Sequence, residues 1–278
     1  MNVLVTGNGK SGSWKIRGEQ LGAAIGATVL PRAAAVVGYD LVVAVKRPPL
    51  VTGVPIVYDI LDAWPQPAGN AWGKPECMTW LRKSVAAIRP VGIVAATRAM
   101  AADCAEFGVP VLALPHHARP GLGRNPIREQ VQVVGYEGAE HYIVGWRPLI
   151  EDECRRRGWR LVVNPARLAD VDIVLALRGA TGYAPRHWKS NVKLANAQAS
   201  GTPFIGCREA GYMETAVGAC EKWADTPEEL AQAFDALTPQ GERRRAAQWM
   251  LSVAPTLDQL AGTYRAWLET LCKTAPKS

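Results

Sequence analysis

The sequence predicts an α/β protein of two Rossmann-like domains with helices at its C-terminus, and three observations carry this prediction. Short, β-rich apolar runs alternate with segments of helix length, which is typical of a doubly wound parallel sheet. The first run, Asn2–Thr6, leads directly into the glycine-containing loop Gly7–Ser13, as at the start of such a sheet. The alternation then begins again after the Pro- and Gly-rich stretch Pro115–Pro126.

The first domain is expected to contain six short strands, each built mainly from β-branched and aliphatic residues. The glycine loop that follows the first strand matches neither the dinucleotide fingerprint nor a Walker loop, so by itself it does not identify a ligand. We expect strands at Asn2–Thr6, Ala27–Leu30, Asp40–Val45, Pro55–Tyr58, Gly92–Ala95 and Val109–Leu114, and helices at Trp14–Ile25, Lys74–Ile88 and Thr97–Phe107.

The second domain repeats the pattern with clearer helix boundaries. Ser190 is expected to cap a helix that Gly201 ends, and Thr226 to cap a helix whose first position is Pro227. We expect strands at Gln130–Val134, Arg160–Val163, Asp172–Leu177, Phe204–Cys207 and Ala219–Trp223, and helices at Pro148–Arg157, Asn191–Ser200, Thr226–Leu237, Gln240–Val253 and Leu257–Leu271.

These elements give the expected domain boundaries. Residues 1–120 form the first domain, residues 121–129 a linker, and residues 130–254 the second domain. The last helix, within residues 255–278, is expected to pack back on the first domain.

Composition narrows the class of protein. The 278 residues are 48% hydrophobic and 21% charged, as in globular proteins, and the net charge of +7 favours an acidic partner or substrate. No apolar run reaches the roughly 18 residues of a membrane-spanning helix, and the N-terminus does not resemble a signal peptide, so a cytoplasmic protein without transmembrane association is expected. The six cysteines lack metal-site spacing, so no metal site is expected.

The stretch from His187 to Glu214 is the most informative part of the sequence. Lys189 and Lys193 lie at the start of a predicted helix, where a basic side chain opposes the helix dipole unless an anion is present. Asn196 lies on the same helix face as Lys193. This arrangement indicates a phosphate or diphosphate site, with a solvated pair of lysines as the alternative.

Several segments, in the correct order, resemble the retaining, nucleotide-sugar-dependent glycosyltransferases of the GT-B fold, the group typified by glycosyltransferase family 4. Together they cover most of the chain. The segments are PIVYDILDAW at Pro55–Trp64, AATRAM at Ala95–Met100, VPVLALPHHARP at Val109–Pro120, KLANAQASGTPFI at Lys193–Ile205, the loop Glu209–Glu214, and DTPEELAQAFDAL at Asp225–Leu237.

The resemblance implies two domains that face each other across a cleft and a retaining, metal-independent transfer of a sugar. The donor would be a nucleotide-diphosphate sugar, first of all a UDP-sugar, with no permanently bound cofactor. Two features depart from the family. Its pair of glutamates falls on Trp188 and Asn196, and its Arg and Lys after the first strand of the second domain are absent from Val134–Glu140. Other cations must then meet the diphosphate charge.

The resemblance also implies roles for individual residues. Asp62 would orient or deprotonate the acceptor hydroxyl, or else form a turn. His116 would approach the donor or acceptor, and Glu214 would bind the sugar, although each has a structural alternative. The expected catalytic residues are thus Asp62, His116 and Glu214; the donor-binding residues are Arg178, Arg186, Lys189, Lys193, Asn196, Glu209 and Gly211; the acceptor-binding residues are Gly9, Lys10, Ser11, Arg17 and Asp59.

The acceptor is inferred from size, charge and tryptophan content. The chain resembles compact viral enzymes that glycosylate hydroxymethylated bases in DNA, and its ten tryptophans, many beside Lys or Arg, are suited to stacking bases. A hydroxymethylated DNA base is therefore the preferred acceptor, in the host cytoplasm if the protein is viral. The alternatives are an envelope glycan or lipid acceptor, and a catalytically inactive binding protein of the same fold. The sequence does not indicate an oligomeric state.

Overall fold

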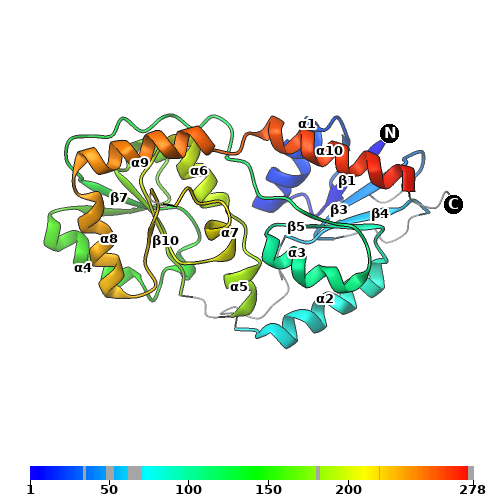
Figure 1. The fold of residues 1–278 in the computed structure, drawn as a ribbon, viewed down its shortest axis with the longest axis horizontal. Helices are drawn as coiled ribbons and strands as arrows, with labels where there is room; N and C mark the ends of the chain where they lie inside the picture. Colours follow the sequence, from blue (N-terminus) through cyan, green and yellow to red (C-terminus); the bar gives the residue numbers. More distant parts are fainter. Residues whose placement is uncertain (34–35, 48–52, 62–70, 180–181, 219, 275–278) are drawn as a thin grey trace. The chain divides into compact units, whose positions relative to one another are not determined.

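The computed structural model describes residues 1–33, 36–47, 53–61, 71–179, 182–218 and 220–274. These residues form two compact units, each built around its own parallel sheet (Figure 1). Unit 1 comprises Met1–His116, Gly182–Ser190 and Thr256–Ser278, and unit 2 comprises His117–Thr181 and Asn191–Pro255.

The sheet of unit 1 has six parallel strands in the order β2-β1-β3-β4-β5-β6. Its four central strands are buried along their whole length, as expected of a sheet that is covered on both faces. The strands are β1 (Val3–Gly7), β2 (Thr28–Val29), β3 (Leu41–Val45), β4 (Ile56–Asp59), β5 (Gly92–Ala95) and β6 (Val111–Ala113).

Alternate residues of these strands point into two separate cores. One core lies beneath helices α2 (Lys74–Ile88), α3 (Arg98–Cys104) and α5 (Tyr183–His187). The other lies beneath the π-helix η1 (Trp14–Gln20), α1 (Leu21–Ala24) and the last helix, α10 (Leu257–Thr274), which Figure 1 shows running alongside α1. A short 3-10 turn, η2 (Ala105–Phe107), extends α3.

The sheet of unit 2 has five parallel strands in the order β11-β10-β9-β7-β8. The strand order reverses direction between β7 and β9, which is the place where doubly wound sheets usually bind ligands. The strands are β7 (Val133–Tyr136), β8 (Arg160–Val163), β9 (Ile173–Ala176), β10 (Phe204–Gly206) and β11 (Lys222–Trp223).

Helices cover both faces of this second sheet. α4 (Arg147–Arg157) and α8 (Pro227–Leu237) close one core, and α6 (Val192–Ser200), α7 (Ala210–Met213) and α9 (Gln240–Val253) close the other. Thr226 caps α8, since its hydroxyl oxygen accepts a hydrogen bond from the Glu229 backbone N–H. Two 3-10 turns, η3 (Glu140–Tyr142) and η4 (Leu168–Asp170), complete the unit.

The predicted fold class is confirmed: two Rossmann-like domains with parallel sheets and C-terminal helices. Several expected details differ. Asn191, not Ser190, is the N-cap of α6, and its side chain makes no capping hydrogen bond. The first helix begins as a π-helix, and α5 was not expected at all. The segment Gly182–Ser190 clusters with unit 1, although it lies within the range expected for the second domain. Across the described ranges, no helix combines the length and apolarity needed to cross a membrane.

Candidate functional site

Polar side chains gather at the carboxyl edge of the unit 2 sheet. In a parallel sheet the carboxyl ends of all strands meet at one edge, so residues far apart in the sequence come together there. Tyr136 ends β7, Arg178 follows β9 and Glu209 follows β10, while the first turns of α6 add Lys193 and Asn196. We call these five residues the carboxyl-edge cluster.

Lys193 is half-buried in this cluster. Its Nζ lies 4.3 Å from the centroid of the Tyr136 ring and 3.3 Å from the Tyr136 hydroxyl oxygen. Burial, reinforced by the nearby charge of Arg178, lowers the pKa of Lys193 to about 8. Among the residues that the structure describes, no carboxylate forms an ion pair with this ammonium group. Glu209 and Glu137 partly offset these effects from a distance, but neither carboxylate pairs directly with the Lys193 ammonium group.

Arg178 is held in place by a carboxylate. Its side chain is 10% exposed, and its Nε lies 2.7 Å from Oε1 of Glu209, which is 5% exposed. The guanidinium carbon also lies 4.7 Å from the centroid of the Tyr142 ring, a cation–π contact. Burial works against the guanidinium charge, yet the Glu209 carboxylate leaves the pKa of Arg178 above its ordinary value. Arg178 is therefore a rigid, permanently charged part of the site.

Asn196 joins α6 to the loop after β7. Its Nδ2 donates to Oε2 of Glu137 over 3.0 Å, and its Oδ1 accepts from the Arg119 backbone N–H over 2.8 Å. The Arg119 guanidinium lies 3.4 Å from the other Glu137 oxygen. Glu137 thus places a negative charge beside the cluster, and a polyanionic ligand would have to bind next to this charge.

Two backbone features shape the space around Lys193. Gly138 has φ of +144°, which favours glycine, and a Cβ atom at this position would lie 3.0 Å from Lys193 Nζ and press on the end of the lysine side chain. The Gly138 N–H donates to Oδ1 of Asn164 over 2.8 Å, which fixes the loop. The α6 N-terminus lacks a side-chain cap, and the free N–H groups of a helix's first turn attract anions.

In unit 1, the glycine loop after β1 is organised by Asn8. The Asn8 Oδ1 accepts hydrogen bonds from the backbone N–H groups of Lys10 and Ser11 and from the Ser11 hydroxyl. Gly9 has φ of +75°, and a Cβ there would lie 2.7 Å from Pro31. The Ser11 hydroxyl oxygen in turn accepts from the Trp14 N–H at the start of η1. The loop leaves the Lys10 side chain exposed.

Arg17 and Asp59 form a buried ion pair instead of lining a surface. Arg17 Nε lies 3.7 Å from Asp59 Oδ2, and each side chain is 1% exposed. An Arg17 Nη2 hydrogen donates to the Leu114 carbonyl oxygen. Burial raises the pKa of Asp59 to about 6, although the charges of Arg17 and Lys46 oppose this rise. Contact of either side chain with an acceptor stays a prediction, and it would require that they become exposed.

The remaining predicted residues are distributed as follows. Asp62 lies outside the described residues. His116 is 3% exposed at the end of unit 1, and Glu214 is the C-cap of α7, not a first-turn residue. Gly211 is buried within α7, in unit 2. Arg186 is exposed in α5 and Lys189 follows that helix, both within unit 1.

Trp188 is a core residue of unit 1. The resemblance in sequence aligns it with a glutamate of the retaining group, but its side chain is fully buried in the core beneath α2, α3 and α5. Its indole Nε1 donates to Oδ2 of Asp103 over 2.8 Å, and the Tyr183 hydroxyl donates to the same oxygen over 2.8 Å. The position has become structural, so it offers no group to a ligand.

Sequence reasoning missed three residues of the site. The stretch that contains Tyr136 and Glu137 indicates only that the expected cations are absent, and Asn164 belongs to no motif. The available signal is the position of Tyr136 at the end of one strand of a parallel sheet, with Glu137 next to it, and of Asn164 directly after another, since ligand-binding side chains concentrate there. Within the described ranges, no group of three His, Cys, Asp or Glu residues could hold a metal ion.

Comparison with protein-family models gives no match, and comparison with curated protein sequences gives none either. The fold, however, matches solved structures over nearly the whole chain. AviGT4, a glycosyltransferase involved in avilamycin A biosynthesis, is 17% identical with a TM-score of 0.59, covering 99% of both chains. HepE of Anabaena, in complex with UDP and glucose, is 14% identical with a TM-score of 0.65, covering 97% of this chain and 100% of its own.

A third match is sucrose-phosphate synthase of Thermosynechococcus elongatus, which is 9% identical with a TM-score of 0.64 over 99% of this chain and 100% of its own. At these identities the comparisons establish the fold. This chain has the two-domain GT-B architecture of glycosyltransferases.

Proposed function

We propose that this protein is a glycosyltransferase that takes its sugar from a nucleotide-diphosphate sugar bound at the carboxyl-edge cluster. The observation that carries the proposal is the half-buried Lys193 ammonium, which has the Tyr136 ring and hydroxyl beside it and no carboxylate ion pair within the described part of the chain. Partial desolvation of a cation costs free energy, and a diphosphate in direct contact with Lys193 would compensate that cost.

The residues suggest a division of labour. Lys193 and the uncapped α6 N-terminus would hold the diphosphate, and Arg178, oriented by Glu209, would supply a second cation. When the bond between sugar and diphosphate breaks, these groups would stabilise the negative charge left on the phosphate. The acceptor oxygen would form the new bond to the sugar and lose its proton to a base, for which Asp62, His116 and Glu214 stay the proposed candidates.

The remaining details of the donor are finer proposals. Asn196 would exchange its bonds to Arg119 and Glu137 for one to a ribose hydroxyl. A UDP-sugar is the first candidate because the structurally similar HepE has been solved with UDP and with UDP-glucose, whereas an α1,3-fucosyltransferase of this fold was solved with GDP. Retention of configuration and independence of metal are supported by the resemblance in sequence alone.

The donor proposal is tested by a thermal-shift screen against UDP-, GDP-, ADP-, CDP- and TDP-sugars. Binding to the folded state alone raises the melting temperature by mass action, so we expect a rise with one nucleotide class. Lys193→Ala should abolish the rise, while Lys83→Ala, which removes an exposed lysine of α2, should leave it unchanged. No rise with any donor would contradict the proposal and favour a binding protein that has lost donor recognition.

For the acceptor we propose a hydroxymethylated base in DNA. The net charge of +7 supports a polyanionic partner. The tryptophans support it less than expected, because Trp14 and Trp188 are at most 1% exposed and serve the core. Transfer of labelled sugar to hydroxymethylated DNA but not to unmodified DNA would support this acceptor. Transfer only to a glycan or lipid would replace the acceptor and leave the donor proposal standing.

A further inference from the structure

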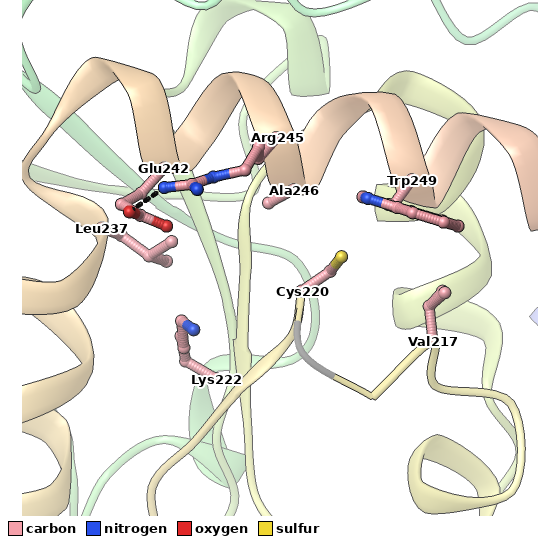
Figure 2. Close-up of a pocket in the computed structure, with 8 residues that line it drawn as sticks. All are labelled: Val217, Cys220, Lys222, Leu237, Glu242, Arg245, Ala246 and Trp249. Atoms are coloured by element: carbon pink, nitrogen blue, oxygen red, sulfur yellow. Dashed lines mark hydrogen bonds and ion pairs between the residues drawn. The ribbon is translucent and has the colours of Figure 1, made fainter.

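Unit 2 contains a pocket that the proposed reaction does not use (Figure 2). It has a volume of about 480 Å³ and lies between α9 and the segment that leads into β11. This size is typical of small-molecule sites, which span roughly 300 to 1,000 Å³. Val217, Cys220 and Lys222 contribute one wall, and Arg245, Ala246 and Trp249 of α9 contribute the other.

The pocket is separate from the carboxyl-edge cluster. Cys220 precedes β11 and Lys222 begins it, so this wall lies at the amino end of that strand. The carboxyl-edge cluster lies at the opposite ends of β7, β9 and β10, because all strands of the sheet run parallel. A molecule in this pocket would therefore not occupy the proposed donor site.

The lining combines an apolar slot with positive charge. The Trp249 side chain is 59% exposed, which is unusual for the largest apolar side chain, and Figure 2 shows its ring beside Val217 and the Cys220 sulfur. Arg245 and Lys222 add two cations against the single carboxylate of Glu242, which pairs with Arg245. A flat aromatic group could stack against the indole while an anionic group meets the guanidinium.

Hydrogen bonds hold Val217 and Thr215 on the side opposite α9. Both oxygens of the buried Glu221 carboxylate accept from the Val217 N–H over 3.0 Å. The side-chain amide of Gln198, on α6, donates to the Thr215 carbonyl oxygen over 2.8 Å. Holding Val217 in this way reduces the entropy that its ordering would cost when a ligand binds.

From these observations we infer that this pocket binds a small amphipathic anion, with an aromatic group against Trp249 and an acidic group at Arg245. The inference is independent of the proposed function, since none of the residues involved belongs to the carboxyl-edge cluster.

The test uses 8-anilinonaphthalene-1-sulfonate, an aromatic sulfonate whose fluorescence rises on binding, titrated into the full chain. We expect one saturable site, about tenfold weaker in Trp249→Ala and in Arg245→Gln, which corresponds to about 1.4 kcal/mol. Arg244→Gln is the matched control, because Arg244 is the exposed neighbour of Arg245 on the same helix and does not line the pocket. Near-ultraviolet circular dichroism of each variant checks that the fold is intact.

Two further measurements separate the alternatives. Lys193→Met should leave the dye affinity unchanged, so loss of binding in that variant would place the dye in the donor site and overturn the inference. Equal affinity in wild type, Trp249→Ala and Arg245→Gln would also overturn it. Gel filtration tests whether the Trp249 face instead contacts a second copy of the chain. A wild-type dimer that dissociates in Trp249→Ala, together with no saturable dye binding, would show such a contact and overturn the inference.

Discussion

Lys193 shows how burial and charge compete at a single residue. The side chain loses part of its hydration against Tyr136 and lies near the positive charge of Arg178, and both effects lower its pKa to about 8. Lys193 is therefore mostly protonated at neutral pH, but its pKa lies only slightly above that pH. An anionic ligand in contact with the ammonium group would stabilise its charged form and raise the pKa of Lys193.

This competition predicts a pH dependence of nucleotide binding. Below pH 8 the free protein already carries the charged lysine, whereas above pH 8 it must take up a proton before it can bind. We expect the affinity for the nucleotide identified in the screen to fall about tenfold between pH 7 and pH 9. Calorimetry in buffers of different ionisation enthalpy should detect the proton uptake. Lys193→Met should bind weakly with a flat profile, and an equally steep profile in that variant would assign the titration to another group.

Asp59 shows the same effect of burial on an acidic group, whose neutral form is favoured by a raised pKa. Because the pKa rises from 3.8 to about 6 on folding, the folded state holds the proton more tightly than the unfolded state. The resulting stabilisation is complete below pH 4 and is lost as the pH rises to 6, with a total on the order of 3 kcal/mol.

Urea unfolding of wild type and Asp59→Asn measures this contribution. We expect the free energy of unfolding of wild type, relative to the variant, to decrease between pH 4 and pH 6 and to stay level above it. The variant lacks the titrating group, so it serves as its own reference for all other ionisations. Parallel curves for the two proteins would show that the Asp59 carboxyl titrates at its ordinary pKa.

At the scale of elements, one carboxylate fixes the segment before α6. Asp103 accepts hydrogen bonds from Tyr183 and Trp188, and its Oδ1 lies 3.0 Å from the ammonium group of Lys74. The Thr97 hydroxyl also donates to the His187 carbonyl oxygen over 2.7 Å. These contacts attach α5, and the residues that lead to Lys189, to α2 and α3.

Removing that carboxylate should loosen the segment. We expect Asp103→Ala to accelerate amide hydrogen exchange at residues 182–190 and to lower the free energy of unfolding by about 1–3 kcal/mol, because two donors lose their acceptor. Asp103→Asn keeps one acceptor oxygen and should show a smaller effect. If exchange in this segment is the same in Asp103→Ala as in wild type, other contacts must hold α5 in place.

The regular elements could be predicted from the sequence where local signals were strong. The helix Lys74–Ile88, the strand Arg160–Val163 and the capped helix after Thr226 have clear boundaries, and the structure confirms them. The π-helix at Trp14 and the N-cap at Asn191 could not be predicted, because both depend on packing. Trp14 is 1% exposed and Asn191 fully buried, so neighbouring elements determine their conformation.

The candidate site was predicted only in part, for the same reason. Lys193, Asn196, Arg178 and Glu209 were identified from strand ends and helix spacing, and the structure brings them together in unit 2. Tyr136 was missed because a tyrosine ending a strand is usually a core residue. Arg17 and Asp59 follow the positional rule for ligand-binding residues, yet they are buried as an ion pair. Position along the chain does not reveal which side of a helix or strand end remains accessible.

At the scale of the whole molecule, the fold is preserved although little of the sequence is. Solved glycosyltransferases that are only 9–17% identical match nearly the full chain with TM-scores of 0.59–0.65. Each unit retains two apolar cores on either side of a parallel sheet, which depends on the pattern of apolar residues and not on their identity. The fold alone does not determine the activity, which must be argued from the site.

The central claim is that Lys193 holds the diphosphate of a sugar donor that the protein turns over. Its most direct test is the release of nucleoside diphosphate from the donor identified in the screen, measured with hydroxymethylated DNA, unmodified DNA and no acceptor. We expect release by wild type and by Lys83→Met, and at least about a hundredfold less by Lys193→Met, in line with the loss of one group that stabilises developing charge. Equal release by Lys193→Met and wild type would contradict the account.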